Sequence, residues 1–491
     1  MSFLIIAFNA DQRHGQIKEL VALAHIRVFN HYIQSPYVVL AAIEFTILAA
    51  CAYLSIVLTQ PAVILEAAQF GLVIRFTLIY ASVMLLSTFS MGVYETGVKE
   101  NFAAMAVRSV VSFCLVGGIL MLLLGYILFS VSVMKGALFT AVALSLASVL
   151  AVRYAFYSVV DAVRLRRRIL VLGAGKKAAQ MIESIRAEAS VGFDIVGFIP
   201  SDGNSIEVPE HQLLDSVGGI GHLVSKHNVD EIVVALDDRR RDSGGYFPLD
   251  ELLDWKLNGV RITPLVGFYE RELGRIELAE IHPGWMVFGD GFRYSRSRDG
   301  GKRVFDIGIS LVLLALVWPL MLMTMLAVFL ETGRPVLYKQ QRVGFNGRVF
   351  EIVKFRSMTQ NAEQDGKAVW AQQNDARVTR IGAFIRNTRL DELPQIFNVL
   401  KGEMSFVGPR PERPEFVGDL AKQLPYYEAR HRVKPGLMGW AQLKYPYGAS
   451  VEDAANKLVY DLYYVKNHSV LLDVLIVVQS VEVILLGKGV R

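Results

Sequence analysis

Two adjacent carboxylates are the clearest candidates for chemistry in this sequence. Asp391 and Glu392 lie in the segment 386–416, RNTRLDELPQIFNVLKGEMSFVGPRPERPEF, and Pro394 follows them closely, as is typical of the first turn of a helix. The positive end of a helix dipole favours anions there. Because neighbouring helical residues point about 100° apart, one carboxylate could attack a substrate while the other holds a metal. Helix capping by acidic residues is the alternative interpretation of an isolated Asp-Glu pair.

A set of arginines favours the catalytic interpretation, because guanidinium groups make bidentate contacts with phosphate. These arginines are Arg342, Arg356, Arg386, Arg389 and Arg410. Pro409 and Pro411 flank Arg410 and should stiffen its backbone. Taken singly, each arginine could be a solvated surface charge. Together, and beside an apolar segment, they predict a phosphate site at a membrane surface.

That apolar segment, 304–330, is long enough to cross a membrane. Pro319 lies within it, where proline removes a backbone hydrogen bond and bends a helix. Basic residues flank both ends, namely Lys302, Arg303, Arg334, Lys339 and Arg342. A crossing helix would leave one basic cluster on the wrong side. We therefore predict a re-entrant helix over 304–330, which enters one leaflet and returns.

Four further apolar segments of about 20 residues predict a membrane α-helical bundle over residues 38–160. They cover residues 38–59, 71–92, 107–130 and 137–158. Lys and Arg gather in the N-terminal segment 1–37 and in VRLRRR after the fourth helix, but are absent from the first loop. Both ends of the bundle are therefore expected in the cytoplasm, including segment 1–37. Glu44, Arg75 and Arg108 lie within these helices; pairing between helices or snorkelling explains them more simply than an intramembrane site.

Residues 161–290 change to an alternating β/α pattern, which is typical of a parallel sheet. Strands are predicted at 169–175, 193–199, 231–236 and 260–265. The first ends in Gly173-Ala174-Gly175, a G-x-G-x-x-A turn whose glycines would let a phosphate approach the next helix. No acidic residue follows the second strand at the usual position, and Asp202 lies somewhat too far along the chain. A nucleotide site at Gly173 and Gly175, and an unliganded turn kept for packing, both stay open for this Rossmann-like domain.

The remaining segments complete the predicted fold class. Residues 270–300 are expected to be a linker, and residues 300–491 a mixed α/β catalytic domain that contains the re-entrant helix. The apolar segment 470–486 has Asp473, Gln479 and Glu482 spaced through it, which favours a helix on the membrane surface or on the core over a crossing helix.

Composition excludes several classes of protein. Cys51 and Cys114 are the only cysteines, which excludes a disulfide scaffold or a zinc site made of cysteines. A net charge of +5 over 491 residues argues against nucleic acid as a partner. With 53% hydrophobic and 20% charged residues, the chain is too apolar for an ordinary soluble enzyme.

Several long segments in order resemble the bacterial sugar transferase family. They are KRVFDIGISLVLL, PVLYKQQRVGFNGRVFEIVKFRSM, RVTRIGAFIRNTRLDELPQIFNVLKGEMSFVGPRPERPEF and YYEARHRVKPGLMGWAQLKYPYGAS, all within about 300–491. The N-terminal half resembles the large form of this family, which primes exopolysaccharide or O-antigen synthesis. The resemblance implies transfer of a sugar 1-phosphate from a UDP-sugar to undecaprenyl phosphate, with release of UMP. Glucose and galactose are the first candidates for the sugar.

The resemblance also implies residue roles and a location. Asp391 corresponds to the family's nucleophile, which forms a covalent aspartyl-phosphosugar intermediate, and Glu392 to its Mg²⁺ ligand. The phosphate-binding residues correspond to Lys354, Arg356, Arg386 and Arg410. The protein would be a multi-pass homodimer in contact with lipid in the bacterial inner membrane, with its catalytic domain cytoplasmic. Trp318 precedes Pro319 where the family usually has a small residue, which leaves the position of the bend open.

Elementary chemistry agrees with these roles. Attack on a diphosphate ester brings anions together, so metal and guanidinium charges must neutralise it. UMP leaves as a stable anion and the acceptor phosphate is already ionised, so no strong general base is needed.

Two other functions compete with this one. A membrane-tethered nucleotide-binding regulator or sugar-nucleotide enzyme would use the glycine turn, but residues 169–290 contain no Tyr-x-x-x-Lys pair. A scaffold without catalysis would not need the Asp391–Glu392 pair and its arginines.

Overall fold

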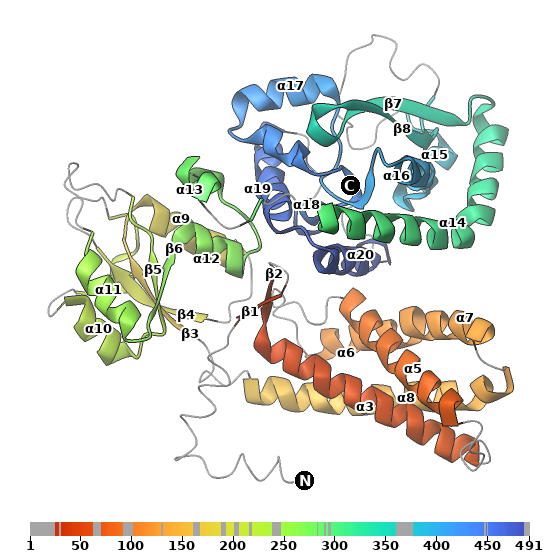
Figure 1. The fold of residues 1–491 in the computed structure, drawn as a ribbon, viewed down its shortest axis with the longest axis horizontal. Helices are drawn as coiled ribbons and strands as arrows, with labels where there is room; N and C mark the ends of the chain where they lie inside the picture. The colour runs from red at the N-terminus through yellow and green to blue at the C-terminus, as the bar shows by residue number, and fades with distance from the viewer. Residues whose placement is uncertain are drawn as a thin grey trace. The chain divides into compact units, whose positions relative to one another are not determined.

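A computed structural model describes most of the chain. The described residues are 25–28, 31–61, 70–91, 102–128, 131–160, 167–187, 193–200, 206–215, 219–237, 247–281, 283–288, 291–292, 296–359, 377–445, 448 and 450–485. The chain forms two compact units (Figure 1). The first holds nearly all residues up to Leu273, and the second holds Gly274–Arg491 with two short stretches, Arg27–His31 and Phe89–Met91. Short strands β1 (His25–Val28) and β2 (His31–Gln34) pair near the start of the described residues.

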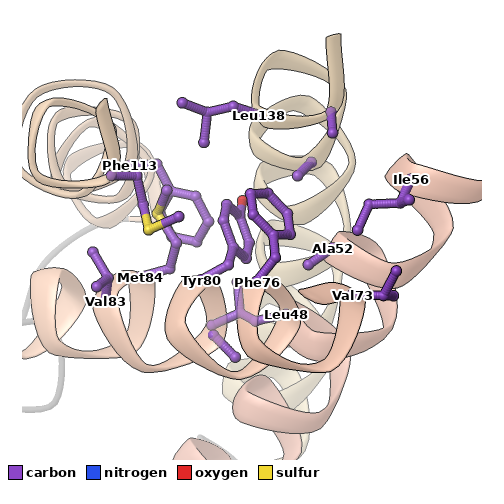
Figure 2. Packing of buried hydrophobic residues seen from close by; sticks show 14 of the residues in the cluster. Leu48, Ala52, Ile56, Val73, Phe76, Tyr80, Val83, Met84, Phe113 and Leu138 are labelled. Carbon is purple, nitrogen blue, oxygen red and sulfur yellow. The ribbon is translucent and has the colours of Figure 1, made fainter. Parts of the chain in front are cut away.

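Apolar helices follow these strands. They are α3 (Ser35–Thr59), α5 (Phe70–Ser90), α6 (Phe102–Val111), α7 (Gly118–Leu128) and α8 (Val131–Val160). A π-helical turn, Ser112–Gly117, joins α6 and α7 into one apolar stretch, Met105–Gly125. Together they provide four stretches long and apolar enough to cross a membrane, as the sequence predicted. Phe76, Tyr80 and Phe113 pack between the helices (Figure 2), whereas many leucines outside the bundle core are exposed.

Polar contacts connect the helices of this bundle. Arg153 on α8 makes a bidentate ion pair with Glu44 on α3, with both nitrogen–oxygen distances 2.6 Å, and donates to Ser109 Oγ on α6 at 2.7 Å. Both charged side chains are almost completely buried. Glu44 therefore pairs between helices, as expected, although its partner Arg153 was not among the charges singled out in the sequence.

The α/β region of the first unit is built on a parallel sheet. Its strands are β3 (Arg167–Leu172), β4 (Phe193–Ile199), β5 (Glu231–Val234) and β6 (Arg261–Pro264), in the order β4-β3-β5-β6. The helices are α9 (Lys176–Ala187), α10 (Gly219–His227), α11 (Leu249–Leu257) and α12 (Leu265–Glu272). Side chains of β3 alternate between two cores, as a strand covered on both faces requires. The four predicted strands are thus present.

The segment after α12 belongs to the second unit. Gly274 accepts a hydrogen bond from Trp440 Nε1 at 2.8 Å, and Ile276 N donates to Val459 O at 3.0 Å. The short helix α13 (Pro283–Phe288) follows, and Lys466 lies over the ring of its Trp285. The expectation of a linker over 270–300 was therefore wrong for these residues, because Trp440 and Lys466 hold them on the second unit.

One long helix, α14 (Arg296–Thr332), contains the predicted re-entrant segment. Arg303 donates to the carbonyl oxygens of Val399 and Leu400, whereas Val328 belongs to a hydrophobic cluster against which Leu393 packs. In a straight helix Arg303 and Val328 would be about 37 Å apart. Leu393 and Val399, in consecutive helical turns, can be only about 10 Å apart. The helix must therefore bend, and Figure 1 shows α14 turning sharply between its two halves.

Many apolar side chains of α14, on both sides of Pro319, are exposed. Exposed residues include Leu311, Val312, Leu316, Trp318, Leu320, Leu322, Met323, Met325, Leu326, Phe329 and Leu330. So large an exposed apolar surface indicates contact with lipid or protein.

The rest of the second unit is mixed α/β. Its strands are β7 (Leu337–Val343) and β8 (Val349–Phe355), which pair antiparallel, and β9 (Ser405–Val407) and β10 (Gly436–Met438), which pair parallel. Its other helices are α15 (Arg380–Asn387), α16 (Ile396–Lys401), α17 (Pro414–Gln423), α18 (Trp440–Lys444), α19 (Val451–Asn467) and α20 (Val470–Leu485). The 3₁₀ turns η9 (Leu390–Gln395) and η10 (Tyr427–Arg432) complete it. Leu472 and Ile476 of α20 are buried, so this helix packs on the core.

Candidate active site

The Asp391–Glu392 pair lies in η9, between α15 and α16. Arg389 adopts the left-handed conformation at φ +58°, which turns the chain sharply after α15. Pro394 follows inside η9, which runs directly into α16. The pair therefore occupies a 3₁₀ turn rather than the first turn of an α-helix. With three residues per turn, the two side chains diverge by about 120°.

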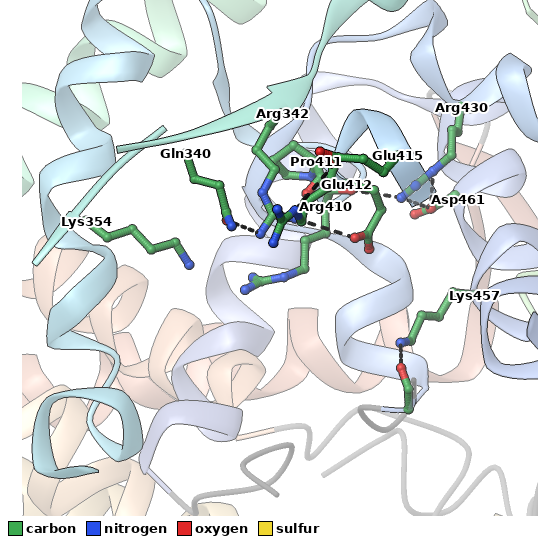
Figure 3. A network of polar contacts seen from close by, with 12 residues as sticks. Gln340, Arg342, Lys354, Arg410, Pro411, Glu412, Glu415, Arg430, Lys457 and Asp461 are labelled. Atoms are coloured by element: carbon green, nitrogen blue, oxygen red, sulfur yellow. Dashed lines mark hydrogen bonds and ion pairs between the residues drawn. The ribbon is translucent and has the colours of Figure 1, made fainter. Parts of the chain in front are cut away.

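Glu392 is held by two cations. Its Oε1 accepts from Arg410 Nη2 at 2.8 Å and from Lys354 Nζ at 3.0 Å. Figure 3 shows Lys354 on β8 and Arg410, which follows β9, approaching the same space. Burial by itself raises the pKa of Glu392, but the charges of Arg410 and Lys354 outweigh it and hold that pKa well below its usual range. Glu392 is thus a permanent anion in the site.

Asp391 has a different environment. It is 8% exposed, and among the residues that the structure describes it has no hydrogen bond or ion pair. Burial raises the pKa of Asp391, and the negative charge of Glu392 adds to the rise, against the opposing charge of Lys354. Adjacent carboxyls with opposite pKa shifts are typical of sites that divide two tasks between them.

Lys354 forms an ion pair with Glu392, and its charge also acts on Asp391 at longer range. Burial lowers the pKa of Lys354, and the Arg410 charge lowers it further, against the attraction of Glu392. The neighbouring carboxylates therefore favour the charged ammonium form.

The structure brings only part of the predicted phosphate-binding set to the pair. Lys354 and Arg410 contact Glu392 directly. Arg356 instead donates through Nη2 to Thr332 O and Gly333 O at the end of α14, and its buried Nε and Nη1 have no hydrogen-bond partner within the described part of the chain. Arg386 lies half-buried on the last turn of α15, with no ion pair among the described residues.

The histidine that follows Arg430 is not suited to act as a base. Burial and the neighbouring Arg430 lower the pKa of His431 to about 4. The ring is therefore neutral at pH 7 and a weak proton acceptor, which agrees with chemistry that needs no strong base.

The glycine turn of the α/β region carries a carboxylate of the chain itself. Gly173 has φ +120°, and a Cβ there would lie 2.5 Å from Ala235 O, so only glycine fits. Asp237, just beyond β5, accepts from the backbone N–H groups of Lys176 and Lys177, each at 2.9 Å. These are the groups that would bind a nucleotide phosphate at the start of α9. Asp237 takes that place, which favours the interpretation of a turn without a ligand.

The residues present fit Mg²⁺. Both cation contacts of Glu392 fall on Oε1, and no further bond to Oε2 is found among the described residues. Within the same residues, no group of three or more His, Cys, Asp or Glu side chains could hold a metal. Magnesium commonly binds through one or two carboxylates together with substrate phosphates and water. Glu392, through Oε2, offers one such carboxylate.

Comparison with known proteins agrees with this site. A family model described as bacterial sugar transferase matches residues 297–487, and one described as CoA-binding domain matches residues 90–242. The chain is 50% identical over 190 residues to a UDP-N-acetylgalactosamine-undecaprenyl-phosphate N-acetylgalactosaminephosphotransferase of Aeromonas hydrophila, covering 39% of this chain and 45% of that protein. It is 34% identical over 333 residues to an undecaprenyl-phosphate glucose phosphotransferase of Komagataeibacter xylinus, covering 65% and 59%.

A third relative is matched over more of its length. The chain is 30% identical over 340 residues to an undecaprenyl-phosphate galactose phosphotransferase of Salmonella typhimurium, covering 66% of this chain and 69% of that protein. The chain thus spans less than two thirds of the first two relatives and slightly more than two thirds of this one. With the dyad and its cations in place, these matches show that the chain belongs to the bacterial sugar transferase family.

Proposed function

We propose that this protein transfers a sugar 1-phosphate from a UDP-sugar to undecaprenyl phosphate, with release of UMP, and so primes exopolysaccharide or O-antigen synthesis. The observation that supports this best is the asymmetry of the acidic pair. Glu392 is fixed by Lys354 and Arg410, whereas Asp391 has no partner among the described residues. A carboxylate without partners can attack, while its paired neighbour supplies fixed negative charge for a metal.

The reaction then takes two steps at one site. An Asp391 carboxylate oxygen attacks the phosphorus that carries the sugar, and the bond from that phosphorus to the UMP oxygen breaks. UMP leaves with the electron pair, and the sugar phosphate remains on Asp391. A phosphate oxygen of the lipid attacks the same phosphorus, the bond to Asp391 breaks, and the carboxylate is restored. Lys354 and Arg410 neutralise charge that develops on the phosphoryl oxygens.

When bound at Glu392, Mg²⁺ would supply further positive charge to the diphosphate. The chain's own contribution is to keep Glu392 ionised and in place, because Arg410 and Lys354 both lower its pKa.

The bent helix α14 gives this site a place at the membrane. Its two ends are held by the same unit: Arg303 by Val399 and Leu400, and Val328 by Phe355 and Ile385. Exposed apolar side chains cover the region between them. We propose that this bend is re-entrant and lies in the inner leaflet, so that the dyad faces the cytoplasm within reach of both substrates.

The relatives suggest which sugars to test. The Aeromonas relative, matched at 50% identity over 190 residues, is named for N-acetylgalactosamine. Those matched over longer stretches at 30–34% identity are named for glucose or galactose. Glucose and galactose stay our first candidates, and the amino sugar belongs in the same panel.

The proposal is tested with the full-length protein in detergent or lipid nanodiscs. UMP release is measured with Mg²⁺, undecaprenyl phosphate and UDP-glucose, UDP-galactose or UDP-N-acetylgalactosamine. Asp391→Asn should lose turnover and covalent labelling by the sugar phosphate while its circular dichroism spectrum is unchanged. Asp419→Asn, an exposed acid of α17, is the matched control and should keep wild-type turnover. Full activity of Asp391→Asn would overturn the assignment of the nucleophile.

A further inference from the structure

A buried ion pair is attached to the backbone of Arg410. Arg430 lies in η10 and Asp461 in α19, and their side chains are only 6% and 3% exposed. Arg430 Nε donates to Asp461 Oδ2 at 3.0 Å, and Nη2 lies 2.8 Å from the same oxygen in an ion pair. The same Nη2 donates to the carbonyl oxygen of Arg410 at 2.9 Å, and Nη1 donates to the Tyr427 hydroxyl at 2.9 Å. Figure 3 shows Arg430, Asp461 and Arg410 in this arrangement.

The neighbouring backbone is held as well. Gly408 N donates to Met438 O at 2.8 Å, and Gly436 N donates to Pro409 O at 3.0 Å. A Cβ on Gly408 would lie 2.2 Å from Lys434 O, so the two segments are in close backbone contact. The peptide group between Pro409 and Arg410 is therefore fixed by Gly436. The Arg430 guanidinium fixes the peptide group between Arg410 and Pro411 with a charge-assisted hydrogen bond.

The link to the reacting groups follows from these contacts. From its fixed backbone, Arg410 extends to Glu392, where Nη2 donates at 2.8 Å. Rotation of the Arg410 peptide would move this guanidinium, and small displacements of a positioned group cost large factors in rate. A buried ion pair is by itself weak evidence for stability. The hydrogen bond from Arg430 to the Arg410 carbonyl oxygen indicates a more specific role for this ion pair.

We propose that Arg430, oriented by Asp461, is a positioning residue that places Arg410 on Glu392 for the transfer reaction. This inference rests on the proposed function. Arg430 contacts neither carboxylate of the dyad, so it acts through Arg410 alone. Lysine at this position keeps the charge but lacks the planar fork that reaches Asp461, Tyr427 and the Arg410 carbonyl together.

The test is a double-mutant cycle on UMP release by the full-length protein. Arg430→Lys alone should lower kcat on the order of 10- to 100-fold with little change in KM for the UDP-sugar. In an Arg410→Ala background, Arg430→Lys should leave kcat almost unchanged, because the guanidinium group that Arg430 positions is absent. A purely structural role would lower kcat by the same factor in both backgrounds, and that additivity would overturn the inference.

A milder variant covers the case in which Arg430→Lys does not fold. Tyr427→Phe removes one of the three acceptors of Arg430 and leaves its bonds to Asp461 and Arg410. It should lower kcat several-fold, again only when Arg410 is present. Arg271→Lys, in a buried ion network with Glu231 and Glu272 of the α/β region, is the matched control and should keep the wild-type kcat.

The outcomes separate the two proposals. If the wild-type protein releases no UMP from any UDP-sugar in the panel, the proposed function fails and the positioning role with it. If the wild type turns over and both Arg430→Lys and Tyr427→Phe match it, the positioning role alone is wrong.

Discussion

Arg410 Nη2 and Glu392 Oε1 lie 2.8 Å apart, and this contact joins two segments that are separated by a helix and a strand. It places a guanidinium group on the carboxylate proposed to bind metal, while the adjacent Asp391 has no partner among the described residues. The chemistry of the site depends on this division between the two acids.

The pH dependence of turnover should follow Asp391. Burial raises its pKa, and Lys354 is the charge that opposes the rise most strongly. Because the attacking form is the carboxylate, activity should fall as pH falls through the pKa of Asp391. Removing the ammonium in Lys354→Met should raise that pKa further and move the acid limb of the kcat/KM profile to higher pH. An unmoved limb, in a variant that still turns over, would contradict this.

Asp391→Asn should be more stable than the wild type, although the proposed mechanism makes it inactive. A carboxyl group whose pKa is raised in the folded state binds protons more readily there than in the unfolded chain. The folded state therefore loses stability as pH rises from the unfolded-state pKa of Asp391 through its raised folded-state pKa. At pH 7 the charged carboxylate destabilises the folded protein. We expect the neutral amide to raise the free energy of unfolding by about 0.5–2 kcal/mol. Thermal unfolding at pH 7 measures it, and a lower Tm than wild type would argue against the raised pKa.

Both ends of α14 should be reached from the same side of the membrane. A Cβ at Gly300 meets nothing within 4 Å, and Arg348 is exposed beyond the other end, so both accept a cysteine probe. In a background without Cys51 and Cys114, Gly300→Cys and Arg348→Cys should both react with an impermeant maleimide in inside-out vesicles and be protected in right-side-out vesicles. Reaction of the two probes from opposite sides would show a crossing helix instead.

Breaking the Arg153–Glu44 ion pair inside the helical bundle should destabilise the protein more than replacing both residues with uncharged ones. Glu44→Gln leaves the Arg153 guanidinium, which is fully buried, without its counter-ion. We expect a loss of about 3–5 kcal/mol in the free energy of unfolding. The double variant Glu44→Gln, Arg153→Leu should recover most of it, because no buried charge remains. Denaturant unfolding in mixed micelles compares the three proteins; equal losses in both variants would mean that the charge is not the cause.

The carboxylate at the glycine turn should stabilise the α/β region without taking part in catalysis. Asp237→Ala removes the acceptor for the N–H groups of Lys176 and Lys177. Loss of such a cap costs about 1 kcal/mol. We therefore expect a lower Tm with an unchanged kcat for UMP release. A large loss of kcat would indicate that the turn contributes to the reaction.

Local pattern was enough to predict the apolar helices and the parallel sheet of this protein. Apolar length predicted the helices of the bundle, and alternation of strand and helix segments predicted the parallel sheet, because both follow from a repeat along the chain. Asp391, Glu392 and Arg410 could be chosen from their residue types and neighbours, and Pro319 with its basic flanks indicated the bend.

Only the tertiary structure decided which groups meet. Lys354 and Arg356 are two residues apart, and a continued strand would place them on one face. The strand β8 ends at Phe355, between the two residues. Lys354, still in the strand, contacts Glu392, whereas Arg356 lies beyond the strand and binds the end of α14. Glu44 with Arg153, Asp237 with the start of α9, and Arg430 with Arg410 are contacts between distant segments. These contacts depend on how helices and strands pack against one another, and a periodic pattern in the sequence does not predict that packing.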